Sequence, residues 1–288
     1  VRSPVLAPLL DALAVASVEG GAVASTLARL ATNARADARR AAEVRARAVR
    51  AIGRLQDVRY LSCLVTRAAD DQLAVRAEAL FALGQLEIPQ AEAPLLALLG
   101  TARTSEERLL AVTALGKVST GDGPGHARLV SLLADADPAV RAKAALALED
   151  LAYRLRRKES PWTPPLADVE AMLPLLAPSQ PADVRAAAAG ALTRFAWLPP
   201  ARARVAPAWS ASALTALVSL LSGPEADVRM RGLQAIGEVA APDLLDSVVG
   251  RSLSDVDWRV RVAAAEAIGR AAPVGRAWSV LLGQELQD

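Results

Sequence analysis

The sequence predicts an all-α protein, a solenoid of about seven helical hairpins stacked side by side. The first observation is a phrase that occurs seven times: Val (once Glu), then Arg, with Ala or Gly three residues after the Arg, Ala after six, and Ile or Leu after seven. Successive arginines of the phrase lie 31, 32, 33, 44, 44 and 32 residues apart. The second is composition: 53% of residues are hydrophobic but only 3% are aromatic, which favours closely packed helices over sheets. Thirdly, no Gly/Ser-rich or strongly charged linker divides the 288 residues.

Each phrase predicts the second helix of a hairpin. With its Val (or Glu) counted as position 0, apolar or small residues fall at positions 0, 4, 5, 7, 8 and 11, which together form one wide helical face. Gly stands at position 9 in five units: Gly53, Gly84, Gly116, Gly237 and Gly269. Because Gly costs about 1 kcal/mol relative to Ala inside a helix, its recurrence indicates a place where neighbouring helices approach closely.

A second apolar segment precedes several phrases and predicts the first helix of the hairpin. Such segments cover residues 93–99, 127–133, 171–176 and 214–221. The links to the phrases, for example residues 134–138 and 222–227, contain Asp and Pro. Asp caps free N–H groups and Pro suits the first helical turn, so these links are typical of hairpin turns.

These repeats resemble the HEAT family, in particular its short, phycobilisome-lyase-like variety, over residues 21–272. The resemblance implies an α-solenoid of the HEAT/armadillo type whose second helices line the concave side. It also implies that the phrase arginine joins a structural ladder with an Asp near the hairpin turn of its own or the adjacent unit. The expected ladder arginines are Arg45, Arg76, Arg108, Arg141, Arg185, Arg229 and Arg261, and the expected partners are Asp137, Asp183, Asp227 and Asp257.

We expect residues 1–288 to form a single array. Residues 275–282, with Trp278, match the first helix of an eighth unit without its second helix. We therefore expect either that the chain is a fragment of a longer polypeptide or that this end docks on something. The two 44-residue steps add about a dozen residues after two consecutive second helices, which predicts long inter-repeat loops near residues 153–166 and 196–211 on one edge.

Candidate partner-binding residues lie where the repeat is irregular. The two predicted loops gather Trp and Arg, the residue types that most often dominate interface energies: Arg156, Arg157, Trp162, Arg202, Arg204 and Trp209. The alternative is that the tryptophans fold back over neighbouring helices as core residues. A further candidate is the stripe formed by Arg47, Arg50 and Arg54, for which the alternative is an ordinary solvated helix face.

The leading hypothesis is a non-catalytic scaffold that binds protein partners, with acidic ones among the candidates, through its concave face and the Trp/Arg-rich loop edge. One alternative is a nucleic-acid-binding protein with a DNA glycosylase-like groove, and another is the repeat arm of an enzyme whose catalytic domain lies outside these residues. One Cys and one His predict no metal site, and we expect no cofactor. The uncharged stretch 205–224 is too polar to predict a membrane span, and localisation stays open with the cytoplasm slightly favoured.

Overall fold

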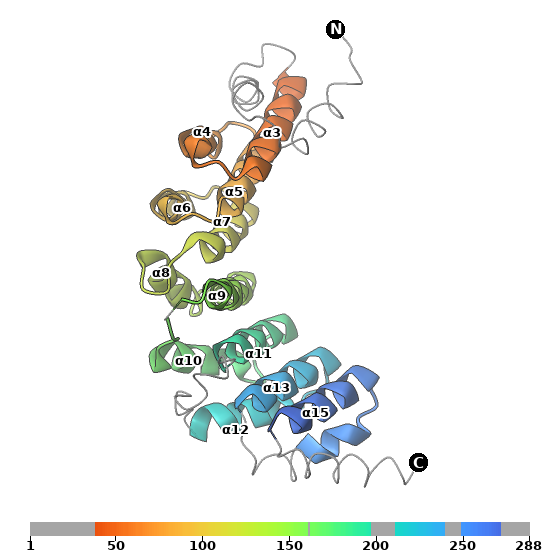
Figure 1. Cartoon of the computed structure of the whole chain (residues 1–288). Helices are drawn as coiled ribbons and strands as arrows, with labels where there is room; N and C mark the ends of the chain where they lie inside the picture. Colours follow the sequence, from red (N-terminus) through yellow and green to blue (C-terminus); the bar gives the residue numbers. More distant parts are fainter. Residues whose placement is uncertain (1–37, 161, 197–210, 240–248, 272–288) are drawn as a thin grey trace. The chain divides into compact units, whose positions relative to one another are not determined.

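The computed structural model describes residues 38–160, 162–196, 211–239 and 249–271. Within these residues every regular element is a helix, so the predicted all-α solenoid is confirmed (Figure 1). The chain divides into two compact parts, one ending at Leu129 and one beginning at Val130. Each part is described by itself.

The first part is built from paired helices. Its phrase helices α3 (Ala38–Leu55), α5 (Leu73–Gln85) and α7 (Ser105–Val118) pack one against the next. The hairpin partners are α4 (Leu61–Arg67), which packs on α5, and α6 (Glu92–Gly100), which packs on α7 (Figure 1). The short helices η1 (Val58–Tyr60) and η2 (Pro89–Ala91) lead into them, and α8 (Pro124–Leu132) runs across the division between the two parts.

The second part repeats this plan. Its phrase helices are α9 (Pro138–Arg157), α11 (Ala182–Ala196), α13 (Ala226–Val239) and α15 (Trp258–Ala271), and each packs on the next. The segments that precede α11, α13 and α15 are α10 (Leu166–Met172) with η3 (Leu173–Leu176), α12 (Ala211–Leu220), and η6 (Gly250–Ser254). First and second helices therefore form two layers, and the phrase helices make up one of them (Figure 1).

The core follows the predicted positions of the phrase. In α5, Val75, Ala79, Ala82 and Leu83 are completely buried, and these are positions 0, 4, 7 and 8. Burial of this face supplies the main stabilising force, because each hairpin covers the apolar face of its neighbour.

Three of the five glycines at position 9 mark close approaches between neighbouring phrase helices. A Cβ on Gly53 would lie 2.7 Å from the Cβ of Ala82. The same construction on Gly84 gives 3.0 Å to the Cα of Ala114, and on Gly237 it gives 2.8 Å to the Cα of Ala267. In all three cases the facing residue is the Ala at position 7 of the next phrase, so Gly and Ala together set the spacing between repeats.

The first long loop is shorter than expected, because α9 continues to Arg157. Leu148, Leu151, Ala152 and Leu155 are buried and continue the apolar face at helical spacing through two further turns. The expectation of a loop from residue 153 was therefore wrong for residues 153–157. Of the second predicted loop, 196–211, only the ends are described: Ala196 closes α11 and Ala211 opens α12.

Candidate functional site

The phrase arginines fasten each second helix to its own hairpin turn. Arg76 Nη1 donates to the carbonyl oxygens of Asp70 at 2.8 Å and Asp71 at 2.9 Å, six and five residues before it. The same pair of bonds recurs in three other units, from Arg141 to Asp135 and Ala136, from Arg229 to Gly223 and Pro224, and from Arg261 to Asp255 and Val256. These carbonyls precede the helix, so the guanidinium group satisfies acceptors that the helix itself cannot.

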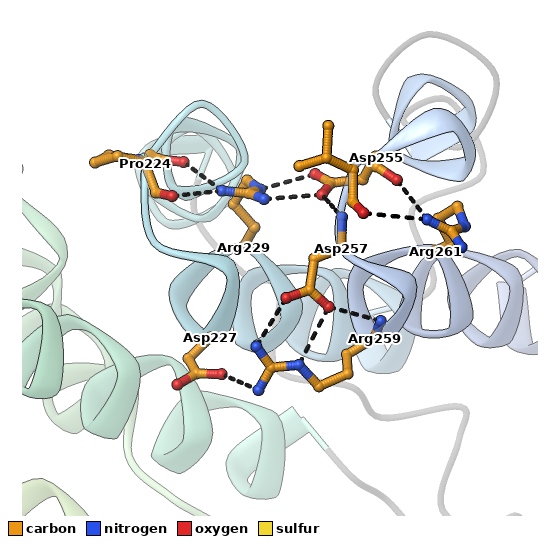
Figure 2. A network of polar contacts seen from close by, with 9 residues as sticks. Pro224, Asp227, Arg229, Asp255, Asp257, Arg259 and Arg261 are labelled. Atoms are coloured by element: carbon orange, nitrogen blue, oxygen red, sulfur yellow. Dashed lines mark hydrogen bonds and ion pairs between the residues drawn. The ribbon is translucent and has the colours of Figure 1, made fainter.

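Phrase arginines also bind acidic side chains of the next unit. Arg45 binds both carboxylate oxygens of Asp70, at 3.0 Å from Nε and 2.9 Å from Nη2. Arg229 binds Asp255 in the same bidentate manner, with both distances 2.8 Å (Figure 2). Arg185 Nη2 lies 2.8 Å from Glu225 Oε2. Such paired, charge-assisted bonds hold adjacent hairpins in register.

The acidic partners differ from those that the sequence predicted. Asp137 accepts a bond from the Ala139 amide at 2.9 Å, and Asp183 accepts one from the Val184 amide at 3.0 Å. An Asp one to three residues before position 0 stands at the helix N-terminus, so its carboxylate engages the free N–H groups there. An Asp five residues before position 0, such as Asp70 or Asp255, lies in the turn beneath the preceding unit's arginine and becomes the ladder partner instead.

The structure explains why one phrase begins with Glu rather than Val. The turn before α7, residues 101–104, contains no acidic residue. Glu107 supplies the missing carboxylate: its Oε1 lies 2.7 Å from Arg76 Nε and 2.6 Å from Arg76 Nη2, while Oε2 accepts from the Arg103 amide at 2.8 Å. Both side chains are at least 92% buried, with 8% and 5% of their surfaces exposed. The sequence signal was present, because Glu107 alone replaces the apolar residue at position 0.

Where the turn offers no acid, an amide takes the same place. The turn before α11 contains Gln180 four residues ahead of Val184, and Arg141 Nη2 donates to its Oε1 at 2.9 Å. The backbone carbonyl of Gln180 also accepts a bond from Arg185 Nε at 3.1 Å. The ladder therefore tolerates an uncharged acceptor, provided that the acceptor oxygen lies in the turn.

The ladder shifts the pKa values of its carboxyl groups downward. For Asp255 the main cause is the hydrogen bonding from Arg229, which outweighs the opposing effect of burial on its pKa. Burial is the largest single influence on the pKa of Asp70 and of Glu107 and acts to raise it, but hydrogen bonds from arginines and backbone amides together reverse it. All three groups therefore remain charged at neutral pH.

A second, more exposed contact joins the last two units, and sequence reasoning missed it. Arg259 Nη1 lies 2.7 Å from Asp227 Oδ1, and its Nη2 lies 2.8 Å from Asp257 Oδ2 (Figure 2). Hydrogen bonds from the Arg259 side chain and amide lower the pKa of Asp257 to about 2. Asp227 and Asp257 were expected to pair with phrase arginines. They both bind Arg259 instead, in the first turn of α15.

The arginine stripe lies on α3, and two of its members are already paired. Arg47 Nη2 lies 2.8 Å from Glu43 Oε1, one turn earlier on the same helix. Arg50 forks onto the carboxylate of Glu78 on α5, with Nε at 2.9 Å. Arg54 is exposed. Glu78 therefore neutralises the stripe where it meets the next repeat, which leaves less positive charge than the sequence alone indicated.

The predicted loop edge is only partly described. Trp162 is half-buried, and its ring meets the buried ring of Phe195 on α11 edge to face, with centroids 6.1 Å apart and planes at 81°. This contact matches the alternative interpretation, in which the tryptophan folds back over a neighbouring helix. Arg156 and Arg157 lie on the last turn of α9 rather than in a loop. Arg202, Arg204 and Trp209 lie outside the described residues.

A cluster on the layer of second helices gathers charged side chains from three helices. We call it the Tyr153 cluster: Glu149, Tyr153, Arg157, Arg194 and Arg231. The ring of Tyr153 lies between two guanidinium groups, with Arg194 Cζ 5.2 Å and Arg157 Cζ 5.9 Å from its centroid. Glu149 Oε1 lies 3.6 Å from both Arg194 Nε and Arg231 Nη1, and these two arginine side chains are 38% and 37% exposed. Helices α9, α11 and α13 thus bring together residues that are 37 to 82 positions apart in sequence.

Gly190 explains how these charges gather. It lies on α11 between Glu149 and Arg231, and a Cβ there would come within 2.7 Å of Glu149 Oε2 and 3.2 Å of Arg231 Nη1. The absence of a side chain at Gly190 leaves space for the carboxylate and the guanidinium group to approach across α11. Nearby, burial lowers the pKa of Arg156, while Glu238 acts to raise it and Arg194 to lower it.

The other features of the described residues offer little chemistry. A cavity of about 110 Å³ in the first part is lined by Arg76, Leu80, Leu98 and Glu107 among others, but its charged groups belong to the ladder pair. Within the described segments, no three His, Cys, Asp or Glu residues are grouped in a way that could hold a metal ion. None of the described helices is both long and apolar enough to cross a bilayer.

Comparison with known proteins assigns the family. The family model for HEAT repeats matches residues 32–116 and 169–269, well over half of the chain. The chain therefore belongs to the HEAT-repeat family. A comparison with curated proteins found no match.

Solved structures of low sequence identity share the fold. The Escherichia coli protein YibA is 15% identical, with a TM-score of 0.61 over 100% of this chain and 93% of its own. An engineered protein is 21% identical, with a TM-score of 0.54 over 96% of this chain and 77% of its own. Kap121p is 16% identical, with a TM-score of 0.60 over 98% of this chain and 32% of its own. This chain thus spans about a third of Kap121p.

Proposed function

We propose that this HEAT-repeat protein is a non-catalytic scaffold, and that its layer of second helices binds an acidic segment of a protein partner at the Tyr153 cluster. The observation that carries the proposal is that the 40%-exposed ring of Tyr153 lies between Arg157 and Arg194, while Arg194 and Arg231 flank a single glutamate. The repeat spacing of 31 to 33 residues in most units supports a relation to the short, phycobilisome-lyase-like variety of HEAT repeat.

The charge of the cluster favours an acidic partner. Arg157, Arg194 and Arg231 contribute three positive charges and Glu149 one negative charge, so the five residues together carry a net charge of +2. At 3.6 Å, Glu149 is too far from either neighbouring arginine for a short hydrogen bond. A carboxylate from a partner could therefore form a shorter bond to Arg231 than the chain's own glutamate does.

The residue types also favour a protein partner. Tyr and Arg are enriched among the residues that dominate binding energy at protein interfaces. The ring of Tyr153 is held between two cations, so its conformational freedom is reduced before a partner arrives. Two of the structures with the same fold are of Kap121p bound to Ste12p and to Pho4p, so an array of this kind can hold protein partners.

The test uses a fluorescein-labelled Glu-rich peptide, with fluorescence polarisation at low and physiological salt. We expect Arg231→Glu to weaken binding at least tenfold and Arg251→Glu, the same charge change at an exposed position on η6, to leave it unchanged. Equal weakening by both variants, or no binding by the wild type, would overturn the proposal. A labelled single-stranded oligonucleotide serves as the competitor, and preferential binding with a steep salt dependence would favour the nucleic-acid alternative.

A further inference from the structure

Phe81 on α5 is an exposed aromatic residue in the first part of the chain. Its side chain is 47% exposed, whereas the other phenylalanine, Phe195, is 2% exposed. Phe81 stands at position 6 of its phrase, where four other units have a polar residue: Arg50, Thr113, Gln234 and Glu266. The repeat therefore does not require an aromatic side chain here. A single exposed apolar residue is ordinary at a protein surface, so the side chains around Phe81 decide whether it belongs to a site.

Lys117 on α7 holds a cation against the ring of Phe81. Its Nζ lies 5.5 Å from the ring centroid, within the range of a cation–π contact. The close approach at Gly84 explains this placement, because a Cβ there would lie 3.5 Å from Lys117 Cδ. The lysine stem thus follows the glycine, and its ammonium group reaches the aromatic residue one turn earlier on α5. The contact restricts the ring before any partner arrives.

A second cation approaches Phe81 from α3, on the other side of α5. Helices α3 and α5 pack in parallel register, because Arg50 Nε donates to Glu78 Oε2 at 2.9 Å and Gly53 faces Ala82. One turn beyond Arg50 on α3 is Arg54, and one turn beyond Glu78 on α5 is Phe81. This register brings the exposed Arg54 to the level of the ring.

These two cations differ from the other basic residues of the same layer. Arg47 is paired with Glu43 and Arg50 with Glu78. For Arg54 and Lys117, by contrast, no ion pair with a carboxylate is found within the residues that the structure describes. Four positive and two negative side chains give this surface a net charge of +2. Its charge therefore complements an acidic ligand, and its ring complements an apolar one.

We propose that Phe81, Arg54 and Lys117 form a second partner-binding site, which we call the Phe81 site. It takes an apolar side chain of a protein segment against the ring, and carboxylates next to that side chain in the segment on the two cations. Removal of the ring from water supplies affinity, and the apolar contact reduces the screening of the charges beside it. The inference rests on the scaffold function proposed above, but on no residue of the Tyr153 cluster.

The surroundings of Phe81 favour a protein segment over a single-stranded nucleic acid. Proteins that bind single strands stack successive bases on several aromatic rings along a basic groove. Phe81 is the one aromatic residue in the sequences of α3, α5 and α7. The carboxylates of Glu43 and Glu78 also lie in this layer, where they would repel a phosphate backbone.

Fluorine NMR tests the site at Phe81 itself. The chain has two phenylalanines, so protein labelled with para-fluorophenylalanine gives one signal from each, and Phe81→Leu assigns them. We expect the end-blocked peptide Glu-Leu-Glu-Trp-Glu to shift the Phe81 signal. The equally charged peptide Glu-Ser-Glu-Ser-Glu should shift it several-fold less, because it has no apolar side chain to place against the ring. No shift of the Phe81 signal, or equal shifts with both peptides, would overturn the proposal.

Charge variants test the two cations. We expect Arg54→Glu and Lys117→Glu each to weaken the binding of Glu-Leu-Glu-Trp-Glu roughly fivefold or more, with melting curves showing that each variant is folded. The matched control is Arg251→Glu, at an exposed position on η6, which should leave the titration unchanged. Equal weakening by all three variants would mean that total charge, rather than the Phe81 site, holds the peptide.

Arg231→Glu separates this site from the Tyr153 cluster. In that variant, Glu-Leu-Glu-Trp-Glu should still shift the Phe81 signal as it does in the wild type. Loss of this shift in Arg231→Glu would contradict a separate site. If Arg231→Glu leaves the binding of the Glu-rich peptide unchanged while the Phe81 signal still shifts, the Tyr153 cluster fails and the Phe81 site stands. Oligothymidylate that shifts the signal at lower concentration than the peptide would assign the site to nucleic acid and overturn the proposal.

Discussion

Arginine has opposite roles in two regions of the molecule. One region is the edge formed by the hairpin turns, and the other is the layer formed by the second helices. At the turns, the side chains of Arg76 and Arg229 are 8% and 11% exposed and bind at 2.6–3.0 Å. On the second helices, Arg194 and Arg231 are 38% and 37% exposed and lie 3.6 Å from the same glutamate. The regular arginines are committed to joining repeats, whereas the irregular ones keep surface that a partner can reach.

The largest expected effect is at the most buried pair of the turn edge. Arg76→Leu leaves the Glu107 carboxylate without its arginine at an almost fully buried site, and it also leaves the carbonyls of Asp70 and Asp71 without their donor. Removing one partner of such a pair costs about 3–5 kcal/mol. The loss of stability should appear as a lower denaturant concentration at the midpoint of unfolding.

The same site provides its own control. Glu107 stands where the other phrases have Val, so Arg76→Leu/Glu107→Val replaces the buried pair with apolar residues and restores the usual phrase. Such replacements are often close to neutral, and we expect the double variant to recover much of the stability. A double variant as unstable as Arg76→Leu would mean that the lost carbonyl bonds, rather than the unpaired charge, dominate.

The next effect distinguishes an inner repeat interface from the last one. Gly237→Ala places a Cβ 2.8 Å from the backbone of Ala267, so the helices must separate, and overpacking of this kind costs about 1–3 kcal/mol. A Cβ at Gly269 would meet none of the described atoms within 4 Å, so the better helix propensity of Ala should stabilise Gly269→Ala by up to about 1 kcal/mol. Thermal unfolding of the two variants should therefore move in opposite directions. A loss at both positions would show that Gly269 is also covered in solution.

Acid should weaken the turn edge in a defined pH range. The folded-state pKa of Asp255 lies below the ordinary Asp value of 3.8, so its pairing stabilises the fold above about pH 4, where the carboxyl is charged in both the folded and unfolded states. That contribution is lost as the pH falls from about 4 through the lowered pKa. Between pH 7 and pH 2, the melting temperature of Arg229→Gln should fall less than that of the wild type. Arg251→Gln, a matched change at an exposed arginine, should follow the wild type, and parallel curves for Arg229→Gln would contradict the linkage.

The sequence predicted the repeats well because their signal is periodic. The phrase located the core positions of α5 and the glycines that meet Ala82 and Ala267, since spacing alone decides which residues share a helical face. The ladder partners were misassigned because an Asp near the start of a helix can either cap that helix or bind the arginine of the preceding repeat. A shift of two residues along the chain decides which of these roles the Asp has. The Tyr153 cluster was missed because its members lie on three different helices and no short motif connects them.

The smallest effect is expected at the stripe on α3, where Arg47 is paired on an exposed helix face. Arg47 is 37% exposed and its partner Glu43 is 62% exposed, so water screens the pair and holding two long side chains together costs entropy. A helical pair four residues apart contributes about 0.3–0.5 kcal/mol, and Arg47→Ala gains part of that back through the high helix propensity of Ala. Denaturant unfolding should therefore barely distinguish Arg47→Ala from the wild type, and 1 M salt should remove any difference. A loss comparable with that of Arg76→Leu would mean that exposure does not separate the two classes of arginine, and the division between the turn edge and the second-helix layer would fail.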